Sequence, residues 1–209
     1  MLARRVGVPS RSSLNVKELT DRTKAIYDQI NAMRYVAASK ALAKLETDLV
    51  AEAASAEADE AQLDREKELL GRLKPMLDKC VDGAIAELQQ LDRNGDFYTV
   101  GKRIKELAPK FKGITRYDEQ IEPLSQSLKR HPKSTEVRLG AQYFYLMDLM
   151  KKKRSDKLLL ALQQFSLRYP KSAYGKAAGA AFKDLQNPKV KVEPRKYLTG
   201  GDGAGVSGC

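Results

Sequence analysis

The longest regular pattern in this 209-residue sequence runs from Gln62 to Leu91, where apolar residues recur at steps of three and four. This spacing puts them on one face of an α-helix and does not fit a β-strand, whose side chains alternate with a period of two. Pro75 lies inside the pattern, and we expect it to kink the helix or to mark a boundary. The apolar positions are Leu70, Leu73, Leu77, Cys80 or Val81, Ala84, Leu88 and Leu91.

Helix-forming residues dominate most of the remaining sequence. Gly and Pro are sparse between residues 16 and 185, where Ala, Leu, Lys, Glu and Gln are abundant. Short breaks divide this span into about eight predicted helices, and short connections favour antiparallel neighbours. We therefore predict an all-α fold of stacked antiparallel helical hairpins. The breaks are Asn31 to Arg34, Ala54 to Glu60, Asn94 with Gly95, Lys112 with Gly113, Pro132 with Lys133, Lys153 to Asp156, and Pro170 with Lys171.

The two ends of the sequence differ from this helical span. Residues 1–14 are basic and lack helical periodicity, and residues 187–209 carry Pro, Gly and charge without a repeating apolar face. Both ends are predicted to be flexible, the second as a Gly-rich tail. The predicted helical-repeat domain is therefore residues 15–186.

Internal similarity divides this domain into three predicted units, about residues 15–75, 76–131 and 132–186. A shift of 58 residues superposes six apolar positions in one frame, and a shift of 62 gives a similar match nearer the N-terminus. Any two amphipathic helices match at some shift, so the shared turn spacing is what favours true repetition. The first shift pairs Leu88 with Leu146, Leu91 with Leu149, Val100 with Leu158, Ile104 with Leu162, Leu107 with Phe165 and Phe111 with Tyr169.

The turn Tyr169-Pro170-Lys171-Ser172 has a second copy, His131-Pro132-Lys133-Ser134, 38 residues earlier. In such a turn the proline stops one helix and the serine can cap the next. Together with the segment LLLALQQFSLRYPKSAYGKAAGAAFKDL, residues 158–185, this turn resembles the tetratricopeptide-like hairpins of bacterial envelope proteins, among them the outer-membrane assembly lipoprotein and the Tol-Pal cell-division coordinator. The 58-residue spacing and the large side chains at Leu146 and Leu158 depart from that pattern and predict an irregular superhelix.

The resemblance implies a non-enzymatic scaffold that presents a helical-repeat groove to a protein or peptide. Similar hairpins follow thioredoxin-like domains in secreted bacterial proteins, so a helical accessory region of such an envelope protein is a further alternative. The residues themselves predict neither a catalytic centre, a metal site nor a cofactor. His131 is the single histidine and lies among cations, Cys80 and Cys209 form no Cys-x-x-Cys pair, and no Gly-x-Ser-x-Gly occurs.

The net charge of +11 is unevenly distributed, with an acidic segment at residues 46–68 and a basic C-terminal half. A basic cluster in that half predicts binding of nucleic acid or of another anionic surface, as the alternative to a peptide groove. A plain structural interpretation also exists, in which these cations are solvated and complement a helix C-terminus. The candidate partner-binding residues are Lys151, Lys152, Lys153, Arg154, Lys157, Arg168 and Lys171.

The sequence has no run of about twenty apolar residues that could cross a bilayer, and its first nine residues lack the apolar block of a signal peptide. We expect a cytoplasmic protein if Met1 is the natural start, and a bacterial envelope protein if a signal has been removed. Neither the identity of the partner nor the oligomeric state follows from the sequence.

Overall fold

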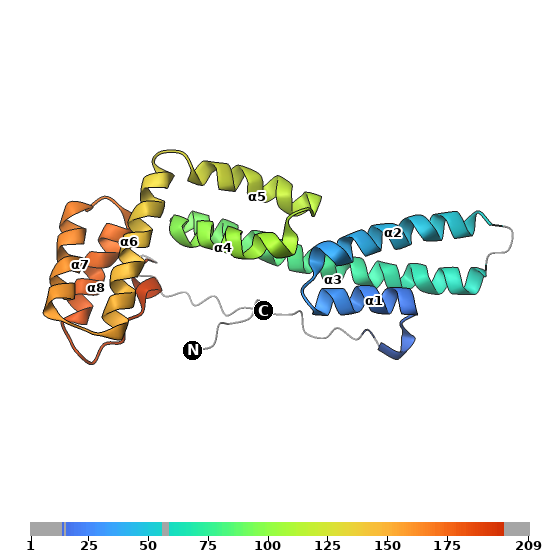
Figure 1. The fold of residues 1–209 in the computed structure, drawn as a ribbon, viewed down its shortest axis with the longest axis horizontal. Coiled ribbons are helices and arrows are strands. Elements are labelled where there is room, and N and C mark those ends of the chain that lie inside the picture. The colour runs from blue at the N-terminus through green and yellow to red at the C-terminus, as the bar shows by residue number, and fades with distance from the viewer. Residues whose placement is uncertain (1–13, 15, 56–58, 199–209) are drawn as a thin grey trace. The chain divides into compact units, whose positions relative to one another are not determined.

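A computed structural model describes residue 14 and residues 16–55 and 59–198 (Figure 1). Helices cover 81% of the described residues, which contain no strand, and this confirms the all-α class. Of the predicted flexible segments 1–14 and 187–209, the described residues include only residue 14 and residues 187–198. The helices are α1 (Asp21–Asn31), α2 (Tyr35–Ala53), α3 (Glu60–Arg93), α4 (Phe97–Phe111), α5 (Thr115–Leu128), α6 (Lys133–Lys152), α7 (Asp156–Arg168) and α8 (Ala173–Leu185), with the short 3-10 helices η1 (Val16–Glu18) and η2 (Pro194–Tyr197).

Each predicted break between helices coincides with an observed one. The two Pro-x-Ser turns nevertheless differ in how they start the next helix. Ser172 is the N-cap of α8, and its hydroxyl accepts hydrogen bonds from the backbone N–H groups of Tyr174 and Gly175. Ser134 is the second residue of α6. The N-cap of α6 is Pro132, and no side chain forms a capping hydrogen bond at this end. The predicted cap is therefore confirmed at Ser172 and wrong at Ser134, because α6 begins two residues earlier relative to its proline than α8 does.

Pro75 lies inside α3 and does not end it. A proline in a helix interior removes a backbone hydrogen bond and costs about 3 kcal/mol. Leu70, Leu73 and Leu77 on either side of it are buried, and burial of each leucine side chain contributes about 1.5–3 kcal/mol. The buried face outweighs the proline, so the unit limit predicted near residue 75 falls inside a continuous helix.

The contacts of the chain divide it into two compact units. Within the described residues, the first unit comprises residues up to 86 with 107–120, and the second comprises 87–106 with 121–198. In the first unit α1 and α2 form an antiparallel hairpin beside the first part of α3 (Figure 1). This division follows contacts and not sequence similarity, so the three repeat units stay a prediction.

The repeat-matched positions contribute to the interior of these units. Leu88, Val100 and Leu162 are completely buried, and Leu107, Phe111 and Phe165 are nearly so. Half-buried positions make up the rest of the set, and none is exposed: they are Leu91, Ile104, Leu146, Leu149, Leu158 and Tyr169. The helical spacing in the sequence therefore identified residues that face the interior.

The core of the second unit lies between α6, α7 and α8, which stand side by side (Figure 1). Two tyrosines, Tyr143 and Tyr174, are its largest fully buried side chains. Burial raises the pKa of both phenols, so each stays protonated and acts as a hydrogen-bond donor. The core residues are Leu139, Tyr143, Met147, Met150, Leu162, Phe165, Tyr174, Ala177, Ala178, Ala181 and Leu185.

Glycines allow these helices to approach one another closely. A Cβ atom on Gly140 of α6 would lie 2.4 Å from the Cβ atom of Tyr98 and 2.7 Å from Cζ of Tyr174. A Cβ atom on Gly175 of α8 would lie 1.8 Å from the backbone oxygen of Tyr169. Side chains at these two positions would push α6 and α8 away from their neighbours.

A buried hydrogen-bond network joins α8 to the start of α4. The Tyr174 hydroxyl donates to Oδ1 of Asp96 at 2.9 Å and accepts from the backbone N–H of Tyr98 at 3.0 Å. Asp96 Oδ1 also accepts from the backbone N–H of Thr99 at 3.2 Å, so it caps the first turn of α4. Both Asp96 and Tyr174 are buried, which makes an unpaired partner costly.

Residues 187–198, which the sequence places in a flexible tail, pack against the second unit. The buried Tyr143 hydroxyl donates to the backbone oxygen of Pro194 at 2.7 Å, and Pro194 is itself buried. Lys196 forms an ion pair with Asp184 at 2.9 Å. The predicted limit at residue 186 is therefore too early, because a short segment without helical periodicity can still be fixed by contacts with a neighbouring core.

Met33 occupies a backbone conformation that normally requires glycine. It follows α1 with a φ of 58°, its N–H donates to the oxygen of Ile30, and the N–H of Arg34 donates to the oxygen of Gln29. This is a Schellman motif, in which the left-handed residue is usually Gly. Gly95 fills the equivalent place after α3, with a φ of 73°.

We expect Met33→Gly to stabilise the first unit by about 0.5–1 kcal/mol, because it removes a left-handed side chain whose cost exceeds the added chain entropy. Urea unfolding followed by circular dichroism measures this change. Gly95→Ala is the matched control and should lower stability by a similar amount. A destabilising Met33→Gly would show that the exposed methionine side chain stabilises the turn by its own contacts.

We expect Gly140→Ala to destabilise the second unit by about 1–3 kcal/mol through overpacking against Tyr98 and Tyr174. Gly71→Ala is the matched control: a Cβ at Gly71 meets nothing within 4 Å, so this substitution should stabilise α3 by about 1 kcal/mol. Thermal and urea unfolding of both variants provide the comparison. Equal effects of the two substitutions would contradict the close packing at Gly140.

Candidate functional site

The structure separates the seven predicted partner-binding residues into two groups. Lys151 and Lys152 are in the last turn of α6, Lys153 and Arg154 follow it, and Lys157 is in the first turn of α7. Because α7 is 13 residues long and rises about 1.5 Å per residue, its two ends are about 20 Å apart. Of the other two residues, Arg168 is the last residue of α7 and Lys171 follows it, so both lie at the far end of this helix. The prediction that all seven form one cluster is therefore wrong.

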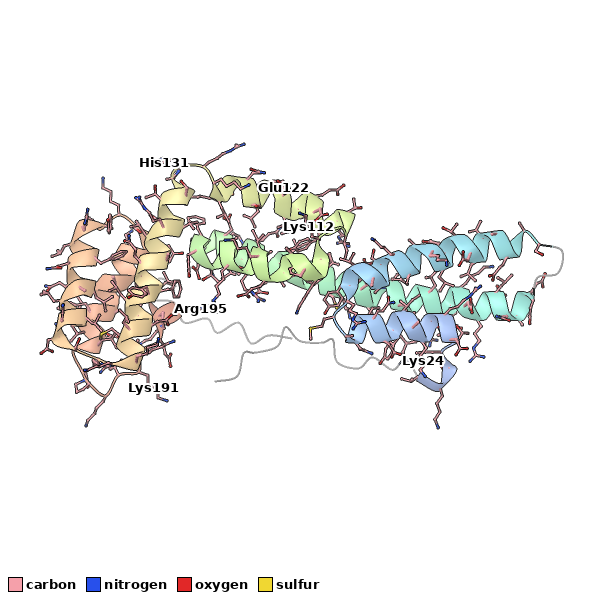
Figure 2. All side chains as sticks on the ribbon, viewed as in Figure 1. Lys24, Lys112, Glu122, His131, Lys191 and Arg195 are labelled. Carbon is pink, nitrogen blue, oxygen red and sulfur yellow. The ribbon has the colours of Figure 1, made fainter. Side chains whose placement is uncertain are left out.

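Antiparallel packing brings other lysines to the first of these ends. Helix α8 runs back along α7 and ends at Leu185, beside the place where α7 begins. The segment that follows α8 is fixed there by Arg154, which donates to the backbone oxygens of Asn187 at 3.0 Å and Val190 at 2.5 Å. Figure 2 shows Lys191 at the end of the α6–α8 bundle opposite to His131.

We call this surface the basic end and define it by exposed lysines from two segments of the second unit. The α6–α7 connection and the start of α7 supply four of them, and the last turn of α8 with the following segment supplies three. They are Lys151, Lys152, Lys153, Lys157, Lys183, Lys189 and Lys191.

Sequence reasoning missed Lys183, Lys189 and Lys191 because they lie about thirty residues from the cluster at 151–157. The lengths of the two helices could have predicted the position of these three lysines. Two consecutive antiparallel helices of 13 residues each return the chain to its starting end. Counting residues between Ser155 and Leu185 would have placed the three lysines beside the others.

Arg154 has a structural role instead of the predicted partner-binding one. Its guanidinium is half-buried between two chain segments and donates to two backbone oxygens. Those two carbonyl groups lie just beyond α8, where no further helical turn supplies backbone N–H donors for them. Arg154 therefore holds the segment after α8 against the α6–α7 connection and brings the lysines of both segments to one end.

The net positive charge of the protein is concentrated in the C-terminal part of the chain, which contains this end. Residues 121–198 contain seventeen Lys or Arg and six Asp or Glu, whereas residues 1–120 contain twenty-one and twenty. In the second unit, Lys133 pairs with Asp92 at 2.6 Å and Lys196 with Asp184 at 2.9 Å. The hydrogen bond between Lys196 and Asp184 raises the pKa of the lysine and lowers the pKa of the carboxyl, so both stay charged and offset each other.

The seven lysines of the basic end form no ion pair with any residue in the described part of the chain. Three carboxylates are close in sequence: Asp148 in α6, Asp156 at the start of α7, and Glu193. They reduce the positive potential without cancelling it. Like charges gathered on one surface repel one another, so the basic end does not stabilise the folded unit.

The opposite end of α7 has a different character. The Arg168 guanidinium lies over the ring of Tyr169, 5.5 Å from its centroid, and this contact fixes it on the surface of the unit. Lys171 is exposed in the turn before α8. These two cations are too few and too far from the basic end to belong to it, which makes them suitable controls.

The described residues include no group of three His, Cys, Asp or Glu side chains that could hold a metal ion. One buried carboxylate, Glu66, lies in the first unit and accepts from Arg22 at 3.2 Å, while Arg22 also contacts Glu52 at 2.5 Å. Hydrogen bonding to Glu52 and Glu66 raises the pKa of Arg22, so the guanidinium stays charged. This arrangement joins α1, α2 and α3 and is structural.

Comparison of the chain with protein-family models, with curated proteins and with solved structures finds no match. The tetratricopeptide-like resemblance and the peptide groove that it implies therefore stay predictions. Within the described part of the chain, no helix is both long enough and apolar enough to cross a membrane.

We expect Arg154→Gln to destabilise the second unit by about 1–2 kcal/mol, because two backbone oxygens lose a charged donor. Lys152→Gln is the control and should change stability by no more than about 0.5 kcal/mol, since its side chain is exposed. Urea unfolding and hydrogen exchange at residues 187–192 measure the two effects. An Arg154→Gln variant as stable and as protected as the wild type would contradict the assigned structural role.

Proposed function

We propose that this protein is a non-enzymatic helical binding protein whose basic end binds the phosphate backbone of a nucleic acid. The observation that carries the proposal is the convergence of seven exposed lysines, none of which has an ion pair within the described residues, from the α6–α7 connection and the segment around the end of α8. Lysine ammonium groups act as point charges on flexible stems and suit phosphates without fixed geometry. Binding and not catalysis is proposed because the basic end contains neither a nucleophile with its base nor a metal-ligand set.

The composition of the basic end also indicates the mode of recognition. Sequence-specific reading of single-stranded bases uses aromatic side chains that stack on them, and the basic end has none. Bidentate reading of guanine in duplex DNA is most often made by arginine, and the one arginine nearby, Arg154, is engaged with Asn187 and Val190. We therefore propose contacts to backbone phosphates that do not depend on base sequence.

The helical-hairpin architecture fits this role as a support. Antiparallel helices fix the relative positions of the two lysine-bearing segments, and Arg154 holds the second of them in place. A surface fixed in this way loses less conformational entropy on binding than a disordered basic tail. The proposed protein is therefore still a helical scaffold, but its proposed partner is an anionic macromolecule.

The salt dependence of binding tests this proposal. We expect the full chain to bind a duplex of about 20 base pairs with an affinity that falls steeply between about 50 and 200 mM salt, because each phosphate contact releases counterions. Lys152→Glu with Lys153→Glu, and separately Lys189→Glu with Lys191→Glu, should each reduce the steepness of the log–log salt plot by about two. Fluorescence anisotropy of a labelled duplex measures both quantities.

The matched control is Arg168→Glu with Lys171→Glu, which makes the same charge change at the other end of α7. It should weaken binding much less than either double variant at the basic end, while circular dichroism shows that all three remain folded. Equal weakening by all three would show a net-charge effect and contradict the assigned surface. If polyglutamate of similar length displaces the duplex at equal charge concentration, the partner class is an acidic protein instead.

A further inference from the structure

A second surface of the second unit, on the outer face of α7, is apolar and is not explained by nucleic-acid binding. Leu160 is 50% exposed and Leu167 is 74% exposed. They are seven residues apart, with Gln164 between them, so they lie on one face of the helix. Lys157 and Arg168 lie on the same side of α7, one in its first turn and one in its last. The face is therefore an apolar strip with a cation at each end.

The first unit has a face of the opposite charge with the same kind of exposed apolar residue. Val50 in the last two turns of α2 is 69% exposed. Thr47, Ala51 and Ala54 are exposed beside it and are small, so another helix can approach this part of α2 closely. Residues 46–68, which include the end of α2 and the start of α3, contain nine Asp or Glu and two Lys or Arg.

Charge decides which face can cover α7. If α7 packed against α7 of a second copy, Lys157 and Arg168 would lie against the same cations and repel them. The end of α2 instead presents an exposed apolar residue, Val50, that is surrounded by an acidic region. Glu46 and Glu52 already pair with Lys74 and Arg22, so the attraction comes from the summed field of the region and not from a new buried ion pair.

We propose that α7 of one copy packs against the C-terminal half of α2 of a second copy, with Leu160 and Leu167 on one side and Val50 on the other. The two faces differ, so the contact is heterologous and joins copies head to tail. A single helix pair buries less area than a stable dimer needs, and the association is weak. Lys157 belongs to both surfaces, but the proposed contact rests on Leu160, Leu167 and Val50, so this inference does not depend on the proposed nucleic-acid binding.

Sedimentation velocity of the full chain tests the self-association. We expect the apparent mass to rise above the monomer mass of 23.3 kDa as concentration increases from about 10 µM to about 1 mM. The rise should continue past the dimer, because a head-to-tail contact leaves one free face at each end of the assembly. A higher salt concentration should reduce the apparent mass only moderately, since salt screens the charges but the apolar contact persists.

Two single variants separate the two faces. Val50→Lys places a cation opposite the cations of α7, and Leu167→Gln removes the most exposed leucine while keeping helix propensity. Each variant alone should remain monomeric at concentrations where the wild type associates. Mixed in equal amounts, they should form a dimer that does not grow, because the intact α2 of one binds the intact α7 of the other.

Tyr145→Gln is the control, because Tyr145 is 64% exposed on α6, away from both faces, and it should leave the association unchanged. All variants change exposed side chains, and circular dichroism and thermal unfolding confirm that they fold. A wild-type chain that stays monomeric to about 1 mM overturns the proposal. So does association of either single variant alone, or a mixture that remains monomeric.

Discussion

The close approach of α8 to its neighbours is the packing on which the second unit depends. Gly175 meets the backbone of Tyr169, and Gly140 on α6 meets the ring of Tyr174. Without side chains at these positions the three helices fit together tightly enough to bury Tyr143 and Tyr174 completely. The buried hydroxyl of Tyr174 then reaches Asp96 and ties α8 to the start of α4. These two glycines therefore determine how closely the helices pack, and the helices in turn determine where the surface lysines lie.

Arg154 shows why charge in a sequence is a poor guide to the role of a single cation. It belongs to the run Lys151 to Arg154, but its planar guanidinium reaches two carbonyl oxygens at once, and neither neighbouring lysine could do this from a single ammonium. The arginine is therefore used inside the unit, and the lysines remain in solvent. The hydrogen bonds from Arg154 to Asn187 and Val190 also bring Lys189 and Lys191 to the same end of the unit.

Helical periodicity and turn residues in the sequence were sufficient to predict the fold class, the number of helices and the breaks between them. They were sufficient because each break has a local cause, such as Gly95, Gly113 or the capping serine Ser172. Long-range features were not predictable in the same way. The packing of Pro194 on Tyr143 and the arrival of Lys191 at the basic end depend on where antiparallel helices return the chain. Of the seven candidate residues, four lysines lie together at the basic end, Arg154 donates to backbone oxygens, and Arg168 and Lys171 lie at the other end of α7, so a partner-binding role stays a prediction.

The energetics of the basic end support a binding role over a purely structural one. Seven lysines without ion pairs in the described part of the chain repel one another wherever they approach within the screening length of about 8 Å in physiological salt. Such a surface lowers the stability of the isolated unit, and the packing around Tyr174 and Arg154 must offset that loss. In the proposed complex a polyanion would remove this repulsion, so the folded unit would be more stable in the complex than alone.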